Sequence, residues 1–165
     1  MKLQDLIVSD LMTRNVVSVR TTETLSDAAK RMWDNDCGVI PVLDGESRRV
    51  AGVITDRDIC MATWSRNLAP SAIVVHEAMS RDLVYCAPDD SLVAAEGTMA
   101  ASRVRRLPVL DSASNLVGIL SVTDITRVAG QRSPVRPGFE VSPEQVVDTL
   151  TMITTAQQPA RANEW

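Results

Sequence analysis

The stretch Gly52-Val53-Ile54-Thr55-Asp56-Arg57-Asp58 decides the fold, because the chain repeats its pattern as Gly118-Ile119-Leu120-Ser121-Val122-Thr123-Asp124. Upstream of each copy, Pro41-Val42-Leu43-Asp44 returns as Pro108-Val109-Leu110-Asp111. Residues 8–59 and 75–125 therefore align with an offset of 67 residues, which becomes 66 after a one-residue loop deletion. A repeat of this kind fixes the architecture before any single element is assigned.

The length of each copy predicts how the two are arranged. A unit of about 50 residues buries only part of its own surface, so two tandem copies are expected to pack face to face. The sequence predicts one repeat at 8–64, a linker at 65–74, a second repeat at 75–129, and a linker, helix and flexible end at 130–165. The cleft between the repeats is the expected place for a ligand.

Each repeat predicts the element order strand, helix, strand, strand, helix, which gives an α/β (α+β) fold. The apolar spacing of Leu25, Ala28, Ala29 and Met32 marks one face of a helix. Outside the repeats, Ser142-Pro143-Glu144-Gln145 is typical of a helix start and predicts a C-terminal helix. That helix docks on its own module, on a dimer mate or on a separate partner. The predicted strands are 16–19, 39–43, 50–54, 83–86, 107–110 and 116–120, and the predicted helices are 25–33, 56–64, 91–102 and 122–129.

Composition excludes several classes of partner. The 165 residues are 45% hydrophobic but only 3% aromatic, and 17 basic against 21 acidic residues give a net charge of −4. The chain has neither a basic surface nor an aromatic platform for nucleic acid. No segment approaches the roughly 18 apolar residues of a membrane helix, and the N-terminus lacks the shape of a signal peptide. We therefore predict a cytoplasmic protein with no nucleic-acid or membrane partner.

Cysteine and histidine content gives little support for metal binding or catalysis. Cys37, Cys60 and Cys86 have no metal-type spacing, and Cys37 and Cys60 are interpreted as inert core thiols, with a reactive role as the alternative. His76, the single histidine, stands where the first repeat has Ser9, which favours a capping or surface role. We predict no metal, no catalytic residue and no enzymatic activity.

Two interpretations fit the hydroxyl and acidic residues of the repeated motif. Thr55 with Asp58, and Ser121 with Asp124, have the spacing of a capping box that satisfies free backbone N–H groups at a helix start. The same helix start offers N–H donors and partial positive charge to a phosphate. The adjacent carboxylate accepts hydrogen bonds and suits a pair of ribose hydroxyls. Both interpretations stay open at this point.

The doubled pattern of strand, helix, strand, Pro-Val-Leu-Asp and Gly-x-(Ile/Leu)-(Ser/Thr)-x-x-Asp resembles the cystathionine-β-synthase (CBS) domain, a pair of which is called a Bateman module. The resemblance covers residues 8–129 and is to a stand-alone, bacterial-type CBS protein. It implies two repeats related by a pseudo-twofold axis. They enclose clefts for adenosine-containing ligands such as AMP, ADP, ATP, NAD or S-adenosylmethionine.

The resemblance also implies roles for individual residues. Asp58 and Asp124 would hold ribose hydroxyls, with Thr55 and Ser121 beside the ribose and phosphate. The adenine would lie against small apolar side chains, which are Val17 and Ile40 in the first copy and Val84 and Leu107 in the second.

Basic residues differ between the two copies. Arg105 and Arg106 precede Leu107, whereas Gly38 and Val39 precede Ile40. Since an arginine fork matches phosphate oxygens, we predict unequal clefts in which Arg105 and Arg106 serve the phosphate-bearing one. Arg57 is a weaker candidate of the same kind, and solvated surface charge is the alternative for all of them.

The predicted function is a regulatory module that binds an adenosyl ligand and signals by conformational change to a protein partner. An apolar outer helix face is expected to pair two copies as a homodimer, and the C-terminal helix is the candidate reporting element. The alternative is a ligand-free dimerisation or interaction scaffold. A nucleotide hydrolase comes third, because no general base stands beside a plausible nucleophile.

Overall fold

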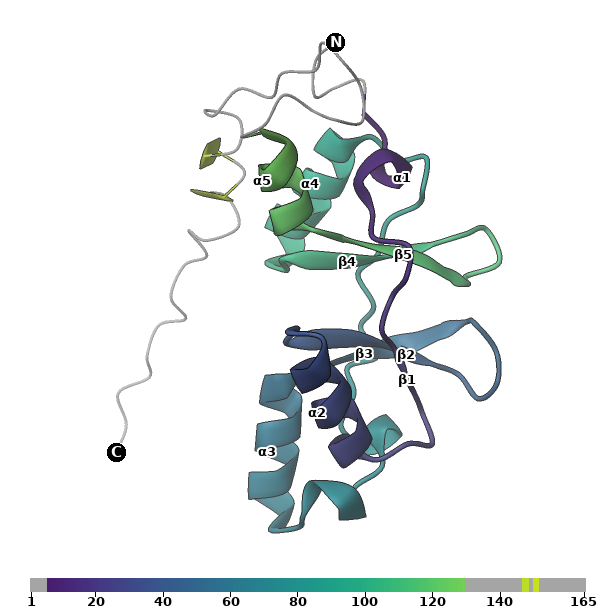
Figure 1. The fold of residues 1–165 in the computed structure, drawn as a ribbon, viewed down its shortest axis with the longest axis vertical. Coiled ribbons are helices and arrows are strands. Elements are labelled where there is room, and N and C mark those ends of the chain that lie inside the picture. The colour runs from purple at the N-terminus through teal and green to yellow at the C-terminus, as the bar shows by residue number, and fades with distance from the viewer. Residues whose placement is uncertain (1–5, 130–146, 149, 152–165) are drawn as a thin grey trace.

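The computed structural model describes residues 6–129, 147–148 and 150–151. Two small mixed units face each other through their sheets, with the helices of each unit on its outer side (Figure 1). The confirmed α/β fold contains α1 (Val8–Leu11), β1 (Val19–Arg20), α2 (Leu25–Asp34), β2 (Val39–Leu43), β3 (Val50–Thr55), α3 (Asp56–Arg66), two short 3₁₀ turns (Pro70–Ala72 and Val75–Glu77), α4 (Leu92–Ser102), β4 (Arg106–Leu110), β5 (Leu116–Ser121) and α5 (Val122–Ala129).

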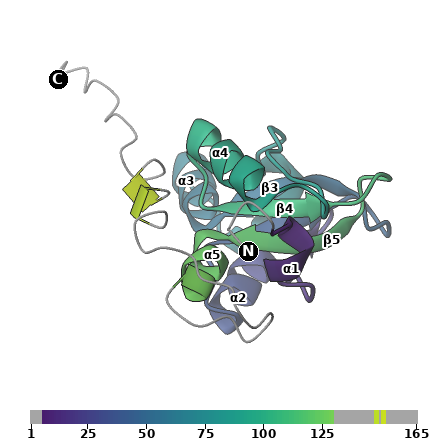
Figure 2. The ribbon, with the colours of Figure 1, turned by 90° about the horizontal axis from the view of Figure 1, so that it is seen from above.

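The two sheets repeat one pairing scheme. In the first sheet β1 runs parallel to β2, and β2 pairs antiparallel with β3, with Val42 opposite Gly52. In the second sheet β4 and β5 pair in the same way, with Val109 opposite Gly118. Viewed from above, the hairpin turns of both units lie on one side of the molecule, with α2, α3 and α4 toward the other (Figure 2). The antiparallel hairpins agree with the prediction.

The first predicted strand of each repeat is wrong in extent. Residues 16–19 contribute only Val19 to β1, which continues to Arg20. Residues 83–86 form no strand, and only Cys86 pairs, through an isolated parallel bridge to Val109. That bridge is the counterpart of the pairing between Val19 and Val42. The β-branched residues before Val19 favour extended backbone, but they lie between the two units and have no neighbouring strand to pair with in register.

Helix boundaries follow the capping signals. Thr24 caps α2, accepting a hydrogen bond from the Asp27 amide at 3.2 Å, and Ser91 caps α4 in the same way through Ala94. Helix α2 ends at Asp34, one residue beyond its predicted end, and Asp36 adopts the left-handed conformation (φ 49°). Helix α5 matches its prediction at both ends. Of the predicted C-terminal helix, only residues 147, 148, 150 and 151 are described, and they are helical.

The two repeats exchange their first segments. Leu6, Val8 and Met12 are buried in the core of the second unit, together with residues of α4, β4, β5 and α5. Ile73 and Val75 are buried in the core of the first unit. The exchange continues along the sheets, because Thr13 forms a bridge with Ile119 of β5 and Ser80 forms the equivalent bridge with Val53 of β3. Each core therefore contains a piece of the other repeat.

The described residues lack two features. Among residues 6–129, 147–148 and 150–151, no helix is long and apolar enough to cross a membrane. In the same part of the chain, no group of three or more His, Cys, Asp or Glu side chains is placed to hold a metal ion.

Candidate ligand site

A cavity of about 400 Å³ lies between the two repeats. It combines the start of the first repeat and its α2–β2 turn with the end of β5 and the first turns of α5. Its lining residues are Thr13, Asn15, Val16, Val17, Asn35, Asp36, Cys37, Val39, Ile40, Arg106, Ile119, Ser121, Thr123, Asp124 and Arg127. The volume is within the roughly 300–1,000 Å³ range of small-molecule pockets.

The polar wall of this cavity is the start of α5. The Ser121 hydroxyl donates to Asp124 Oδ2 at 2.5 Å, and the Ser121 amide donates to the same oxygen at 2.9 Å. The Asp124 amide in turn donates to Ser121 Oγ at 3.2 Å. The capping-box interpretation is therefore confirmed for this motif. It uses only one oxygen of the carboxylate.

The second oxygen of Asp124 is oriented toward a cation. Asp124 Oδ1 lies 3.7 Å from Arg127 Nη1, one helical turn further along α5. The Asp124 side chain is 11% exposed and that of Arg127 is 66% exposed, so the arginine can move away from this long ion pair. A carboxylate held by its cap on one side and open to the cavity on the other is suited to accept hydroxyl protons from a ligand.

The apolar wall comes from the first repeat. Val17 is half-buried against the first core, and Ile40 is only 1% exposed. Both are rigid, β-branched side chains on a short connection and on β2, whose packing fixes their position. The cavity therefore brings Val17 and Ile40 of one repeat together with Ser121 and Asp124 of the other.

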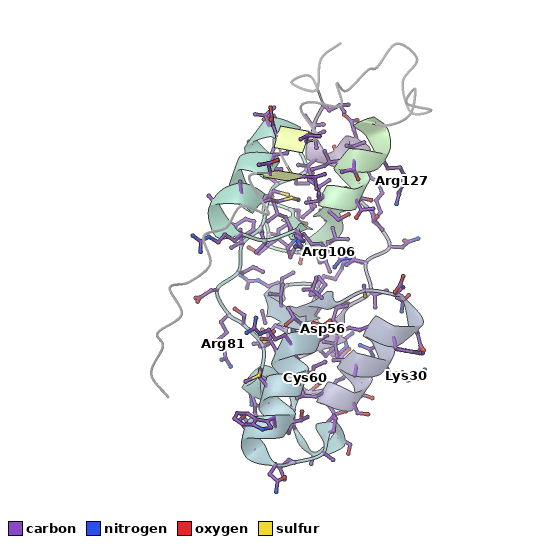
Figure 3. All side chains as sticks on the ribbon, turned by 90° about the vertical axis from the view of Figure 1, so that its left-hand side faces the viewer. Lys30, Asp56, Cys60, Arg81, Arg106 and Arg127 are labelled. Atoms are coloured by element: carbon purple, nitrogen blue, oxygen red, sulfur yellow. The ribbon has the colours of Figure 1, made fainter. Side chains whose placement is uncertain are left out.

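Arg105 and Arg106, which were predicted to serve the same cleft, lie in different environments. Arg106, half-buried at the first position of β4, lines the cavity where the two repeats meet (Figure 3). Arg105 is exposed and is not among the lining residues, although its carbonyl accepts a hydrogen bond from Val122. Arg105 lies in the bend before β4, which begins at Arg106, so the two neighbours have different surroundings.

The remaining candidates lie outside this cavity. Thr55 and Asp58 form the same capping box at the start of α3, with the Thr55 hydroxyl donating to Asp58 Oδ2 at 2.7 Å. Arg57 is exposed on the first turn of that helix. Val84 packs partly buried against the second core, and Leu107 is fully buried within it. Their predicted role in a second cleft stays a prediction.

Several lining residues were missed by reasoning from the sequence. Asn15, Asp36, Cys37 and Thr123 come from connections or helix starts, where local spacing carries no signal for a pocket. Arg127 had a usable signal, because a residue three positions after Asp124 lies on the same helix face.

One of the three cysteines differs from its prediction as a core thiol. Cys60 is exposed on α3 and is not a core residue, while Cys37 is half-buried and Cys86 is buried. Cys60 lies on α3 (Figure 3), and it lines a hollow that residues of α2 also line. Burial raises the pKa of the Cys86 thiol to about 12 and also raises the pKa of Cys37, so both stay protonated and weakly nucleophilic near neutral pH.

The doubled sequence pattern matches a known family. The CBS domain model matches residues 8–64 and 75–130, and the chain therefore belongs to the CBS domain family.

Three relatives illustrate the match. The CBS domain-containing protein YhcV of Bacillus subtilis is 38% identical over 118 residues, covering 72% of this chain and 81% of its own. Hypoxic response protein 1 of Mycobacterium tuberculosis is 34% identical with the same coverage. Its crystal structure with two coordinated zinc ions has a TM-score of 0.67 at 31% identity, covering 74% of this chain and 98% of that one. The structure of CBSX2 in complex with AMP has a TM-score of 0.65 at 25% identity, covering 76% and 96%.

Proposed function

We propose that this protein is a regulatory module that binds an adenosine-containing ligand in the cavity between its repeats. The observation that carries the proposal is the joining of an apolar wall, an open carboxylate and two arginines around one volume of about 400 Å³. The adenine would pack between Val17 and Ile40, the ribose hydroxyls would donate to Asp124, and Arg106 and Arg127 would meet phosphate. The complex of CBSX2 with AMP supports this ligand class.

The turn between α2 and β2 offers a route from the ligand to the outer surface. Asp36 and Cys37 line the ligand cavity and also border a second hollow of about 400 Å³, which residues of α2 and α3 line. Trp33 lines this outer hollow and is 86% exposed. A ligand that moves the α2–β2 turn would therefore also move Trp33. The ligand shifts the equilibrium between two positions of the turn only if its affinity for them differs.

Thermal unfolding with AMP, ADP, ATP, NAD and S-adenosylmethionine tests the proposal. A ligand at 100 times its dissociation constant adds about 2.7 kcal/mol to the free energy of unfolding. We expect one member of this set to raise the Tm, with guanosine nucleotides as the control for charge. If none of the five ligands raises the Tm above the value measured with guanosine nucleotides, the ligand-free scaffold is favoured instead.

The outer face of the first repeat supports the homodimer. Trp33 on α2 is 86% exposed, and Met61 and Trp64 on the neighbouring α3 are 49% and 77% exposed. A contiguous exposed apolar patch is typical of an interaction site. We propose that a second copy of this chain covers them.

Light scattering coupled to size exclusion measures the expected dimer. Replacing Trp33 and Trp64 together with glutamate is expected to give monomers, because the apolar contact is lost and four charges would face each other across the interface. Tyr85→Glu, at an exposed aromatic residue outside the helices, is the matched control and should stay dimeric. A monomeric wild-type protein, or a dimer that survives the double change, contradicts this interface.

A further inference from the structure

A third cavity, of about 250 Å³, lies at the hairpin side of the molecule and is rich in arginine. Its lining includes Arg14, Arg20 and Arg48. Within the part of the chain that the structure describes, Glu46 is the single acidic residue that lines it. The rest of the wall is Val16, Ser18, Leu43, Ser47 and Leu116, of which Val16 also lines the ligand cavity. The volume is below the roughly 300–1,000 Å³ of most small-molecule pockets and suits a small ion or metabolite better than a nucleotide.

Each of the three guanidinium groups is anchored by a backbone carbonyl. Arg14 Nη2 donates to the Ser9 carbonyl at 3.2 Å, and Arg48 Nη2 donates to the Leu116 carbonyl at 2.9 Å. Arg20 Nη1 donates to the carbonyl of Gly45. A guanidinium carries five N–H donors, so anchoring by one carbonyl fixes its direction and leaves others for a ligand. Anchored side chains also lose less conformational freedom when a ligand binds.

The charge of this cavity is not balanced from within. Three positive charges face one carboxylate, and Glu46 lies 3.3 Å from Arg20 with its side chain 92% exposed. An ion pair that exposed contributes little to stability and yields readily to a competing anion. Like charges drawn into one small volume repel each other, and an anion bound among them removes that repulsion.

The second repeat shows that the fold does not need this cluster. Arg14 aligns with Arg81, but Arg20 aligns with Ala87 and Arg48 aligns with Ser114. Arg81 even repeats the local contact of Arg14, because its Nη2 donates to the His76 carbonyl at 2.9 Å, five residues upstream. The arginine cluster is therefore a feature added to one repeat on top of a shared architecture.

The cavity also joins parts of the chain that are distant in sequence. Arg14 belongs to the segment that crosses between the units, Arg20 to β1 and Arg48 to the β2–β3 turn. That turn is tied to the other hairpin, since the Leu116 amide donates to the Arg48 carbonyl at 2.9 Å. Both hairpin turns extend to the same side of the molecule (Figure 1).

We propose that Arg14, Arg20 and Arg48 bind a small phosphate-bearing anion. This site is separate from the adenosyl cavity, and the inference does not rest on the proposed function. Arginine forks match phosphate oxygens with pairs of parallel hydrogen bonds, which gives both strength and direction. Because the anion contacts the crossing segment, β1 and the hairpin turn together, its binding stabilises the contact between the two repeats.

Titration calorimetry of the full chain with inorganic pyrophosphate tests the site. The titration runs in a phosphate-free buffer, with sodium chloride of equal ionic strength as the reference. Arg20→Ala combined with Arg48→Ser installs the residues of the second repeat, and we expect it to weaken pyrophosphate binding about ten-fold or more. Arg81→Ala removes an arginine in the same local setting as Arg14, and it should bind pyrophosphate as the wild type does. The Tm of each variant in chloride verifies that it is folded.

Two further titrations identify the ligand and the cavity. Arg106→Ala removes an arginine that lines the adenosyl cavity, and it should bind pyrophosphate as the wild type does. This separates the two sites even if no adenosyl ligand binds. Citrate carries carboxylates of similar charge, and we expect it to bind more weakly than pyrophosphate. A wild-type titration no different from chloride, or an unchanged affinity in the double variant, overturns the proposal. Loss of binding in Arg106→Ala, or tighter binding of citrate, also overturns it.

Discussion

Replacing Asp124 with asparagine is expected to weaken binding of the adenosyl ligand by roughly 30- to 150-fold, or about 2–3 kcal/mol. Asparagine keeps an oxygen that can accept the capping hydrogen bond from the Ser121 amide, which spans 2.9 Å in the native protein. It loses the negative charge, and hydrogen bonds to a charged acceptor are about twice as strong as neutral ones. The dissociation constant measured by titration calorimetry reports the loss.

Asp27→Asn is the matched control for this change. Asp27 forms the same capping box at the start of α2, with the Thr24 hydroxyl donating to its Oδ2 at 2.7 Å, but it does not line the ligand cavity. Its substitution removes one charge from an equivalent cap and should leave ligand affinity unchanged. Equal affinity in wild type and Asp124→Asn, or an equal loss in both variants, would show that Asp124 only caps its helix.

Replacing Gly52 with alanine is expected to lower the free energy of unfolding by about 3 kcal/mol, and so the Tm by about 6–12 °C. A Cβ at this position would lie less than 3.0 Å from the Ser80 carbonyl oxygen. Ser80 cannot retreat easily, because its amide donates to the Val53 carbonyl at 2.9 Å and its carbonyl accepts from the Val53 amide at 3.0 Å. The added methyl group therefore forces apart the contact between β3 and the exchanged segment.

Gly118→Ala makes the same chemical change at the equivalent position of β5. The nearest atom there is the sulfur of Met12, the flexible part of a side chain that adapts to irregular spaces. We expect a loss of about 1 kcal/mol at this position. Thermal or urea unfolding of both variants measures the difference. Equal losses would mean that the contact of Gly52 with the backbone is not what requires glycine there.

The sequence was sufficient for the elements that carry local signals. Thr55 and Asp58 predicted a capped helix start, and the apolar spacing from Leu25 to Met32 predicted α2. These signals act within a few residues, so the rest of the fold cannot override them easily. The short strand β1 lacked such a signal, because apolar β-branched residues favour extended backbone whether or not a partner strand lies beside them.

The composition of the cleft could not be predicted in the same way. Val8 and Val75 are identical residues in equivalent positions, so either core can accept either segment as far as local chemistry is concerned. Which core each first segment enters therefore depends on how the whole chain connects the two repeats, and not on the segment's own residues. The sequence therefore groups candidate ligand-binding residues within each copy. The cavity instead joins Ile40 of the first repeat to Asp124 of the second.

The exchange of first segments sets the smallest piece of this protein that can be transferred. A single repeat cut at residues 65–74 would carry a first segment whose binding place is in the missing half, and its own core would lack Ile73 and Val75. Fusing one repeat to another protein would transfer an incomplete core. The pair is therefore the unit that can be inserted, duplicated or inherited as a whole.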